Sequence, residues 1–184
     1  FIPQGKAIGG TSSINGMIYI RGSRQDYDNW AAMGCTGWSY ADVLPVFKRL
    51  ETNTRLHDQY HGKSRPLHVT DFSYINALTP VFIEACREIG IPANDDFNGV
   101  QQYGVGKFQY TVKDARRMSA ARAFLRPAQR RSKNLDVVAN THVARVVVEG
   151  KRATGVEIIR PNGHREIVRA AREIIVSAGA FNSP

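Results

Sequence analysis

A glycine-rich turn that leads into an apolar segment is the feature that most constrains the fold of this chain. Gly5, Gly9 and Gly10 precede Thr11-Ser12-Ser13, and the chain then becomes apolar through Met17-Ile18-Tyr19-Ile20. Because glycine lacks a Cβ, such a turn lets another molecule approach the backbone closely. The pattern predicts a loop that presents its backbone to a ligand and then enters a packed part of the molecule.

Length and composition narrow the class of protein. The 184 residues include 25 Lys and Arg against 16 Asp and Glu, which gives a formal net charge of +9. A 42% hydrophobic fraction permits a sizeable core and argues against a disordered or fibrous chain. No apolar run reaches the roughly 18 residues of a membrane span. Cys35 and Cys86 stand far apart, which indicates neither a disulfide framework nor a zinc site and favours a reducing compartment.

Capping residues and chain breakers predict the elements of the first 134 residues. Ser39 with Asp42 three positions later resembles a capping box, and apolar residues at helical spacing follow it as far as Leu50. Thr79-Pro80 is typical of a helix start. The other expected elements are a long surface loop over 51–75 with a short strand near 67–69, a helix over 80–89, a strand over 105–112 and a short helix over 119–130.

After Leu135 the chain changes to short β-type runs. Asn162-Gly163 is a pair that tolerates positive φ at both central positions of a turn. The expected strands cover residues 135–138, 143–149, 154–160, 164–169 and 173–177. This pattern predicts a β-meander flanked by two apolar strands.

The order of the motifs resembles one enzyme family. Residues 5–22, GKAIGGTSSINGMIYIRG, are similar to the first signature of the glucose-methanol-choline (GMC) family of flavin-dependent oxidoreductases. Shorter matches to its choline-dehydrogenase-like branch follow in the same order: Gly37-Trp38-Ser39-Tyr40, Tyr60-His61-Gly62, Asn94–Gly99, Arg117-x-Ser119, Ala123-Phe124-Leu125-x-Pro127 and Gly155-Val156-Glu157. Residues 179–184 resemble the opening of the second signature, so the similarity covers essentially the whole chain.

The resemblance implies a mixed α/β (α+β) fold made of incomplete domains. We expect a segment of a GMC-type FAD-binding domain with the first signature and a connecting helix at 1–58. Part of an antiparallel-sheet substrate domain is expected at 59–134, and the FAD-domain β-meander with a return strand at 135–184. The family's Gly-x-Gly-x-x-Gly turn is not found, and its catalytic His is expected beyond residue 184. We therefore expect an internal fragment without a catalytic residue, inactive alone.

Small residues and short polar groups mark the candidate cofactor site. A flavin ring is flat and needs backbone close to it, with donors aimed where charge accumulates on reduction. The Gly-Gly-Thr-Ser-Ser run alone is typical of a structural turn, but Asn15-Gly16-Met17-Ile18 after it resembles the family signature, and this resemblance implies a flavin contact. The candidates are Gly9, Gly10, Thr11, Ser12, Asn15, Gly16, Met17 and Ile18.

The resemblance adds two candidates and a mode of cofactor binding. It implies that the backbone of Val143 contacts the adenine of FAD, while its side chain is expected in the core. Ala178 follows an expected strand, where small residues allow a nucleotide to approach, although Gly179 beside it equally suits a strand-end turn. Ile14 stands where covalently flavinylated members carry the linking His, which implies non-covalent FAD.

Three other groups of residues have simpler interpretations. His57, His61 and His68 invite a metal site, but Gly62 and Pro66 argue against the helix that would align them, so we expect a solvated loop and no metal. Basic residues gather between positions 116 and 133, and a solvated face is favoured over a polyanion site because the cluster lacks the repeated interleaved aromatic residues of a single-strand platform. The aromatic residues Tyr27, Trp30, Trp38 and Tyr40 are expected to pack in and around a core.

The resemblance implies a parent enzyme that transfers hydride from the CH–OH group of an alcohol to flavin N5 and forms an aldehyde. Its partners would be a small-molecule alcohol and an electron acceptor, either a quinone, another compound or oxygen. Nucleic acid is not expected. The expected location is the cytoplasm, with peripheral association at the inner membrane left open. Two alternatives remain: a basic module that binds nucleic acid or an anionic membrane without catalysis, and a flavin-binding relative that has lost activity.

Overall fold

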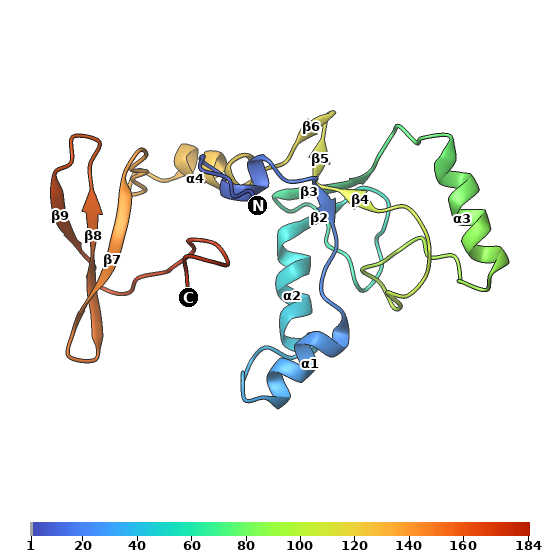
Figure 1. Cartoon of the computed structure of the whole chain (residues 1–184), viewed down its shortest axis with the longest axis horizontal. Coiled ribbons are helices and arrows are strands. Elements are labelled where there is room, and N and C mark those ends of the chain that lie inside the picture. Colours follow the sequence, from blue (N-terminus) through green and yellow to red (C-terminus); the bar gives the residue numbers. More distant parts are fainter. Residues whose placement is uncertain (1) are drawn as a thin grey trace. The chain divides into compact units, whose positions relative to one another are not determined.

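The computed structural model describes residues 2–184 (Figure 1). The chain folds into two compact units, the first ending at Leu135 and the second beginning at Asp136. The first unit contains a 3₁₀ turn η1 (Gly10–Ser13), β1 (Ile18–Tyr19), α1 (Arg24–Ala32), α2 (Tyr40–Leu50), β2 (Glu51–Asn53), β3 (Leu67–Asp71), α3 (Leu78–Glu88), β4 (Gln109–Tyr110), β5 (Val112–Lys113), β6 (Arg116–Arg117), a π-helical turn η2 (Ala121–Leu125) and α4 (Arg126–Arg131). The second contains β7 (His142–Glu149), β8 (Arg152–Ile159) and β9 (Arg165–Arg169). The mixed α/β class predicted from the sequence is confirmed.

A four-stranded sheet in the order β1-β4-β3-β2 forms the centre of the first unit. β1 and β3 both pair antiparallel with β4, whereas β2 runs parallel to β3. Val69 on β3 is completely buried. β1 directly follows the glycine-rich loop, so the sheet fixes where that loop ends.

Two capped helices pack together beside this sheet. Ser39 caps α2 in a reciprocal capping box with Asp42, as the sequence predicts, and Ser23 does the same for α1 with Asp26. The buried side chains of Tyr27, Tyr40 and Val43 form the core between these helices, with Trp30 and Trp38 at its more exposed rim. The packing interpretation of the aromatic residues is therefore confirmed.

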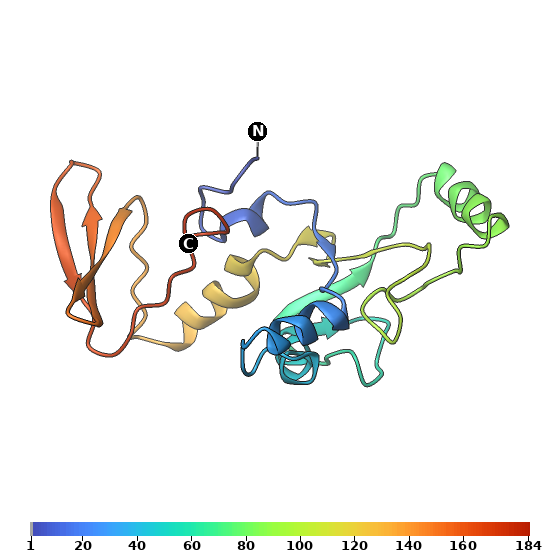
Figure 2. The ribbon, with the colours of Figure 1, turned by 60° about the horizontal axis from the view of Figure 1, so that its bottom comes forward.

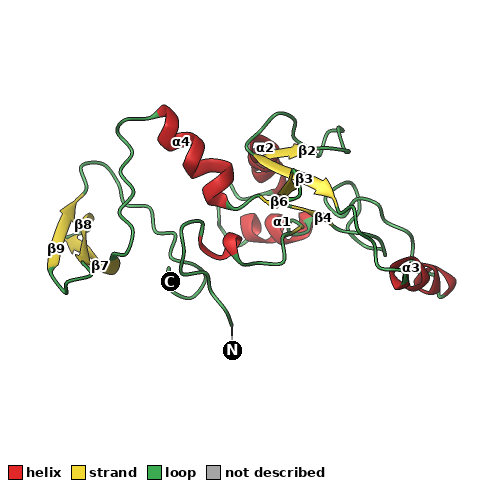
Figure 3. Cartoon of the chain, turned by 90° about the horizontal axis from the view of Figure 1, so that it is seen from above, coloured by secondary structure: helices red, strands yellow, loops and turns green. Residues whose placement is uncertain are grey.

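Helix α3 begins earlier than the sequence predicts. The Oδ1 atom of Asn76 accepts the N–H of Leu78 at 2.9 Å, so the helix starts there and Thr79 lies in its first turn. None of its residues is buried. In all three ribbon views the helix lies apart from the β1–β4 sheet (Figure 1, Figure 2 and Figure 3).

The predictions for residues 105–130 need two corrections. The expected strand over 105–112 is interrupted and leaves only the two-residue strands β4 and β5. The expected helix over 119–130 opens with the π-helical turn, in which Arg126 N–H bonds to the carbonyl of Ala121. Pro127 has no N–H to continue regular α-helical bonding at this point, which gives a physical reason for the wider turn. Arg126 and Arg130 are exposed, in agreement with a solvated basic face.

The second unit is an antiparallel meander in the order β7-β8-β9, as predicted (Figure 2). Gly150 and Gly163 have φ values of 61° and 81° in its two turns. The strands predicted at 135–138 and 173–177 are not formed. A strand needs a neighbour for its backbone hydrogen bonds, and none of the described strands pairs with either segment. No helix in the described part of the chain has the length and apolar character needed to cross a membrane.

Candidate functional site

The hydroxyl groups of the glycine-rich loop bond back to the loop itself. Thr11 Oγ1 accepts the N–H of Gly5 at 3.2 Å, and Ser13 Oγ donates to the carbonyl of Ile8 at 3.0 Å. Ser12 Oγ donates to the carbonyl of Gly9. These bonds fix the shape of the loop with its own polar side chains.

One side of this loop packs against protein and another side is open. Gly9 has a φ of 96°, and a Cβ there would lie 2.6 Å from Ser13 Oγ and 3.2 Å from the Cβ of Ala121. A Cβ added to Gly10 or Gly16 would meet nothing within 4 Å. The backbone at these two glycines is therefore accessible to a flat ligand, so the residues present fit a flavin.

Met17 has a left-handed backbone conformation that is unusual for a side chain of its size. Its φ is 64°, a conformation that costs a non-glycine residue about 1–2 kcal/mol. Asn15 Oδ1 accepts the N–H of Met17 at 3.1 Å, and the carbonyl of Met17 accepts from Thr111 N at 2.8 Å. Backbone strain held in this way is common at ligand sites, and here it lies within the predicted flavin contact.

Side chains from a distant loop hold the segment that follows β1. Asn98 accepts the N–H of Arg21 at 2.8 Å and donates to the carbonyl of Tyr19 at 3.1 Å. Gln102 donates to the carbonyl of Arg21 at 2.8 Å. The backbone leaving the loop is thus fixed at both its donor and its acceptor groups.

Arg21 in this segment also belongs to a buried network of charged and amide groups. The sequence analysis did not predict this network. The guanidinium of Arg21 pairs with the carboxylate of Glu51, and both side chains are almost fully buried, at 2% and 0% exposure. Glu51 Oε1 accepts from Asn53 Nδ2 at 2.8 Å and lies 2.9 Å from His61 Nδ1. His61 Nε2 lies 3.0 Å from Asp96 Oδ2.

This arrangement keeps His61 charged at neutral pH. Burial by itself would lower the pKa of His61, but the hydrogen bonds and negative charges of Asp96 and Glu51 outweigh it and raise the pKa to about 9. Burial would likewise raise the pKa of Asp96, but the hydrogen bonds from His61 and from the Asn98 backbone outweigh it, and the pKa is lowered. Two cations, Arg21 and His61, therefore face two carboxylates, which balances the buried charge.

The expectation of a solvated histidine loop is wrong for His61, which is 2% exposed, whereas His57 is exposed. Gly62 explains the difference, because a Cβ there would collide with the carbonyls of Lys48 and Glu51. Glycine lets the chain pass close to the end of α2 and turn His61 inward. The Tyr60-His61-Gly62 motif was the available signal.

The same histidine belongs to a cluster with the spacing of metal ligands. Ligand atoms of Asp58, His61 and Asp96 lie within 4.8 Å of one another. Both ring nitrogens of His61 already face carboxylates, and Asp58 Oδ1 accepts the N–H of Tyr60 at 2.8 Å. We therefore assign this cluster to ion pairing.

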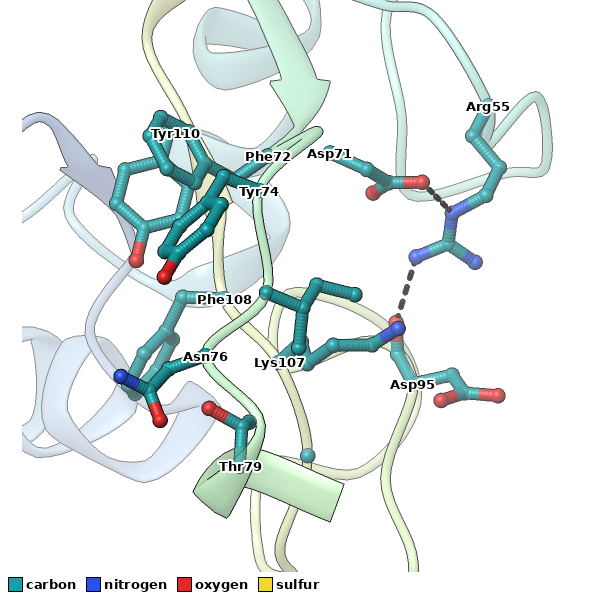
Figure 4. Close-up of a pocket in the computed structure, with 12 residues that line it drawn as sticks. Arg55, Asp71, Phe72, Tyr74, Asn76, Thr79, Asp95, Lys107, Phe108 and Tyr110 are labelled. Carbon is teal, nitrogen blue, oxygen red and sulfur yellow. Dashed lines mark hydrogen bonds and ion pairs between the residues drawn. The ribbon is translucent and has the colours of Figure 1, made fainter.

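A cavity of about 560 Å³ lies beside β3 and β4 (Figure 4). Aromatic rings form one wall, with the centroids of Phe72 and Tyr110 5.0 Å apart. On the other side Arg55 donates to Asp71 Oδ2 at 2.7 Å and to the carbonyl of Asp95 at 2.9 Å, as Figure 4 shows. An apolar wall facing a charged rim suits a small organic molecule of mixed polarity.

Comparison with known proteins assigns the chain to a family. All of its residues, 1–184, match the family model described as GMC oxidoreductase. The chain belongs to the GMC oxidoreductase family. The family predicted from the sequence resemblance is thereby confirmed.

Individual relatives of this GMC chain are enzymes of about three times its length. It is 47% identical over 182 residues to the oxygen-dependent choline dehydrogenase of Rhizobium johnstonii, covering 99% of this chain and 33% of the relative. An FAD-dependent oxidoreductase from Chaetomium thermophilum aligns with a TM-score of 0.89 at 27% identity, covering 99% of this chain and 34% of that one. A fungal aryl-alcohol oxidase aligns with a TM-score of 0.86 at 28% identity, and the alignment covers 96% of this chain and 33% of the oxidase. The chain thus spans about a third of the length of the curated relatives it matches.

The residues predicted to contact FAD lie in both units of the GMC chain. Those from Gly9 to Ile18 form one continuous stretch of the first unit. Val143 lies on β7 opposite Ile158, and its side chain is 53% exposed, so the expectation of a core valine is wrong. Ala178 N–H donates to Ser183 Oγ at 2.9 Å, beside Gly179 with a φ of 89°. The FAD contacts of all these residues stay predictions.

Sequence reasoning missed three residues that hold the loop or the segment after it. Glu51 and Asn98 are distant in sequence from residues 5–22 and join them only through tertiary contacts. Arg117 was visible as part of the Arg117-x-Ser119 motif, but nothing in that motif indicates its target. The structure places its guanidinium on the carbonyl of Asn15 at 2.6 Å.

Proposed function

We propose that this chain is the central part of an FAD-dependent alcohol oxidoreductase that removes hydride from the CH–OH carbon of an alcohol and yields an aldehyde. The observation that supports this function is the loop from Gly9 to Ile18. Its hydroxyl groups are bonded inward, while its backbone at Gly10 and Gly16 is open. Bound FAD would supply the two-electron acceptor for the hydride.

The residues proposed to hold the cofactor are those predicted from the sequence. The flavin ring would lie against Gly9, Gly10, Thr11, Ser12, Asn15, Gly16, Met17 and Ile18, and the nucleotide part would meet the backbone of Val143 and Ala178. Ile14 has an aliphatic side chain without a nucleophilic atom, which supports non-covalent binding. The base that takes the hydroxyl proton would be a histidine outside residues 1–184.

The proposed substrate and electron acceptor are taken from the names of the relatives. The Rhizobium relative is named an oxygen-dependent choline dehydrogenase, and a structural neighbour is an aryl-alcohol oxidase. We propose an alcohol substrate, with choline as the first compound to test and oxygen as the first acceptor. A quinone acceptor would fit an enzyme at the inner face of a membrane, and oxygen a cytoplasmic one.

The test uses the full-length protein that contains this chain. It should purify with FAD, and choline added without oxygen should bleach the visible flavin absorbance, whereas an ethyltrimethylammonium control, which lacks the hydroxyl group, should not. Air should restore the absorbance. A protein without flavin would contradict the proposal. A bound flavin that neither choline nor aryl alcohols bleach would favour the catalytically inactive relative.

A further inference from the structure

The guanidinium of Arg117 is bonded to the predicted flavin loop across a long sequence separation. Its NH1 nitrogen donates to the carbonyl of Asn15 at 2.6 Å, to Asn15 Oδ1 at 2.7 Å and to the carbonyl of Ser12 at 3.3 Å. Arg117 and Asn15 are 102 residues apart. Bonds from a charged donor to carbonyl oxygens are stronger than neutral ones, so this contact constrains the loop strongly.

Neighbours of Arg117 contact the same loop. Ala120 N–H donates to Ser12 Oγ at 2.8 Å, and Gly9 packs closely on Ala121, whose Cβ would lie only 3.2 Å from a Cβ added to Gly9. Three successive contacts therefore join the loop to the segment 117–121. Arg117 itself is held in β6, which pairs with β5 in a short hairpin.

The chemistry of these contacts fixes the orientation of the Asn15 side chain. Arginine carries only donors, and the N–H of Met17 is also a donor, so both must face the amide oxygen of Asn15. Reversing the amide would place its NH₂ group against two donors. The Nδ2 group, which has no hydrogen-bond partner among the described residues, is left as a free donor on an exposed side chain.

No acidic side chain of the described residues neutralises the charge of Arg117. Within residues 2–184 its guanidinium forms no ion pair, and the described bonds run to carbonyl oxygens. A positive charge therefore lies in direct contact with the loop. A fixed charge in this position favours negative charge that develops on a neighbouring ligand.

We propose that Arg117 is a positioning residue for the flavin. It holds the Ser12–Met17 turn and fixes the Asn15 carboxamide, so that Asn15 presents its Nδ2 donor to the cofactor. This inference rests on the proposed function, because it assumes that the loop binds FAD.

The test compares variants of the full-length protein by FAD affinity and flavin midpoint potential. Arg117→Ala should weaken FAD binding to the apoprotein by about tenfold or more and lower the midpoint potential, because it removes a charge-assisted contact. Arg117→Lys, which keeps the charge without the planar fork, should recover the potential better than the affinity. Arg116→Ala is the matched control, since Arg116 is an exposed neighbour on the same strand without a described side-chain contact.

Asn15→Asp keeps the test decisive if Arg117→Ala fails to fold. This variant retains both acceptor contacts to Arg117 but replaces the Nδ2 donor by a carboxylate oxygen. It should unfold at the temperature of the unsubstituted apoprotein, yet bind FAD more weakly and show a lower midpoint potential. A purely structural role would leave both flavin readouts unchanged.

The possible results separate the inference from the proposed function. If the unsubstituted protein binds FAD and both Arg117→Ala and Asn15→Asp match Arg116→Ala in affinity and potential, the positioning role is overturned. If the unsubstituted protein takes up no FAD, the proposed function fails and the inference fails with it.

Discussion

His61 is the single residue through which pH acts most strongly on this fold. Its pKa is about 9 in the folded chain against 6.5 for an unperturbed histidine. A raised pKa means that the folded state binds the proton more tightly than the unfolded state does. The resulting stability is fully present below pH 6.5 and is lost as the pH rises through 9.

We therefore expect the free energy of unfolding to fall by about 3 kcal/mol between pH 6.5 and pH 9 through this residue, since one pKa unit corresponds to about 1.4 kcal/mol. Chemical denaturation of the full-length protein across this range measures the effect. A His61→Gln variant should lack this part of the decline. Parallel curves for the two proteins would show that His61 is not charged in the fold.

A second prediction at this scale concerns the buried carboxylate of Glu51. Glu51→Gln leaves the buried guanidinium of Arg21 without its counter-charge, and loss of one partner of a buried pair typically costs about 3–5 kcal/mol. Glu84→Gln is the control, because Glu84 pairs with Arg87 on the exposed face of α3 and should cost less than about 1 kcal/mol. Unfolding in urea measures both. Equal costs for the two variants would contradict the role of the network.

At the level of elements, the glycine-rich loop packs closely on the π-helical turn, and we expect this packing to contribute to stability and to FAD binding. Gly9→Ala adds a left-handed strain of about 1–2 kcal/mol and also places a Cβ against Ser13 Oγ and Ala121. Gly34→Ala is the matched control for backbone strain, since Gly34 has a φ of 101° but open space around it. Gly9→Ala should destabilise the protein more and weaken FAD binding by about tenfold or more. FAD titration of both variants measures this, and equal affinities would show that the close packing does not matter for the cofactor.

Helices and strands marked by caps or turn residues within a few positions were predicted well. Strands that need hydrogen bonds from a distant segment were not. The capping box of Ser39 and Asp42 defines the start of α2 within four residues of sequence. The turn glycines and β-branched runs likewise define the meander of β7 to β9. Residues 173–177 have the same β character but form no strand, because no described strand offers them hydrogen-bond partners.

For the whole molecule, the exposed apolar side chains of α3 predict how the 184-residue chain behaves alone. Leu78 is 73% exposed, Val81 65% and Phe82 66%. Exposed apolar groups clustered on one helix favour association. The isolated chain should therefore elute from gel filtration above its monomer mass of 20.5 kDa and should not retain FAD. Monomeric elution, or a stoichiometric yellow chromophore, would contradict this expectation.

At the same scale, charge alone does not identify a function. The net charge of +9 and exposed residues such as Arg126 and Arg130 are compatible with a module that binds a polyanion. The family match over residues 1–184 instead favours an enzyme segment. Salt-sensitive retention on heparin without any flavin in the full-length protein would revive the binding module.

Sequence patterns were enough to predict the family, the mixed fold class, helix α2, the meander and the candidate site from Gly9 to Ile18. All of these depend on residues close together along the chain, where caps, turns and signatures act locally. Three features became visible only in the folded chain: His61 is buried and charged, Glu51 pairs with Arg21, and Arg117 holds Asn15. These contacts join residues 10 to 102 positions apart, and their energies depend on burial and geometry that exist only once the chain has folded.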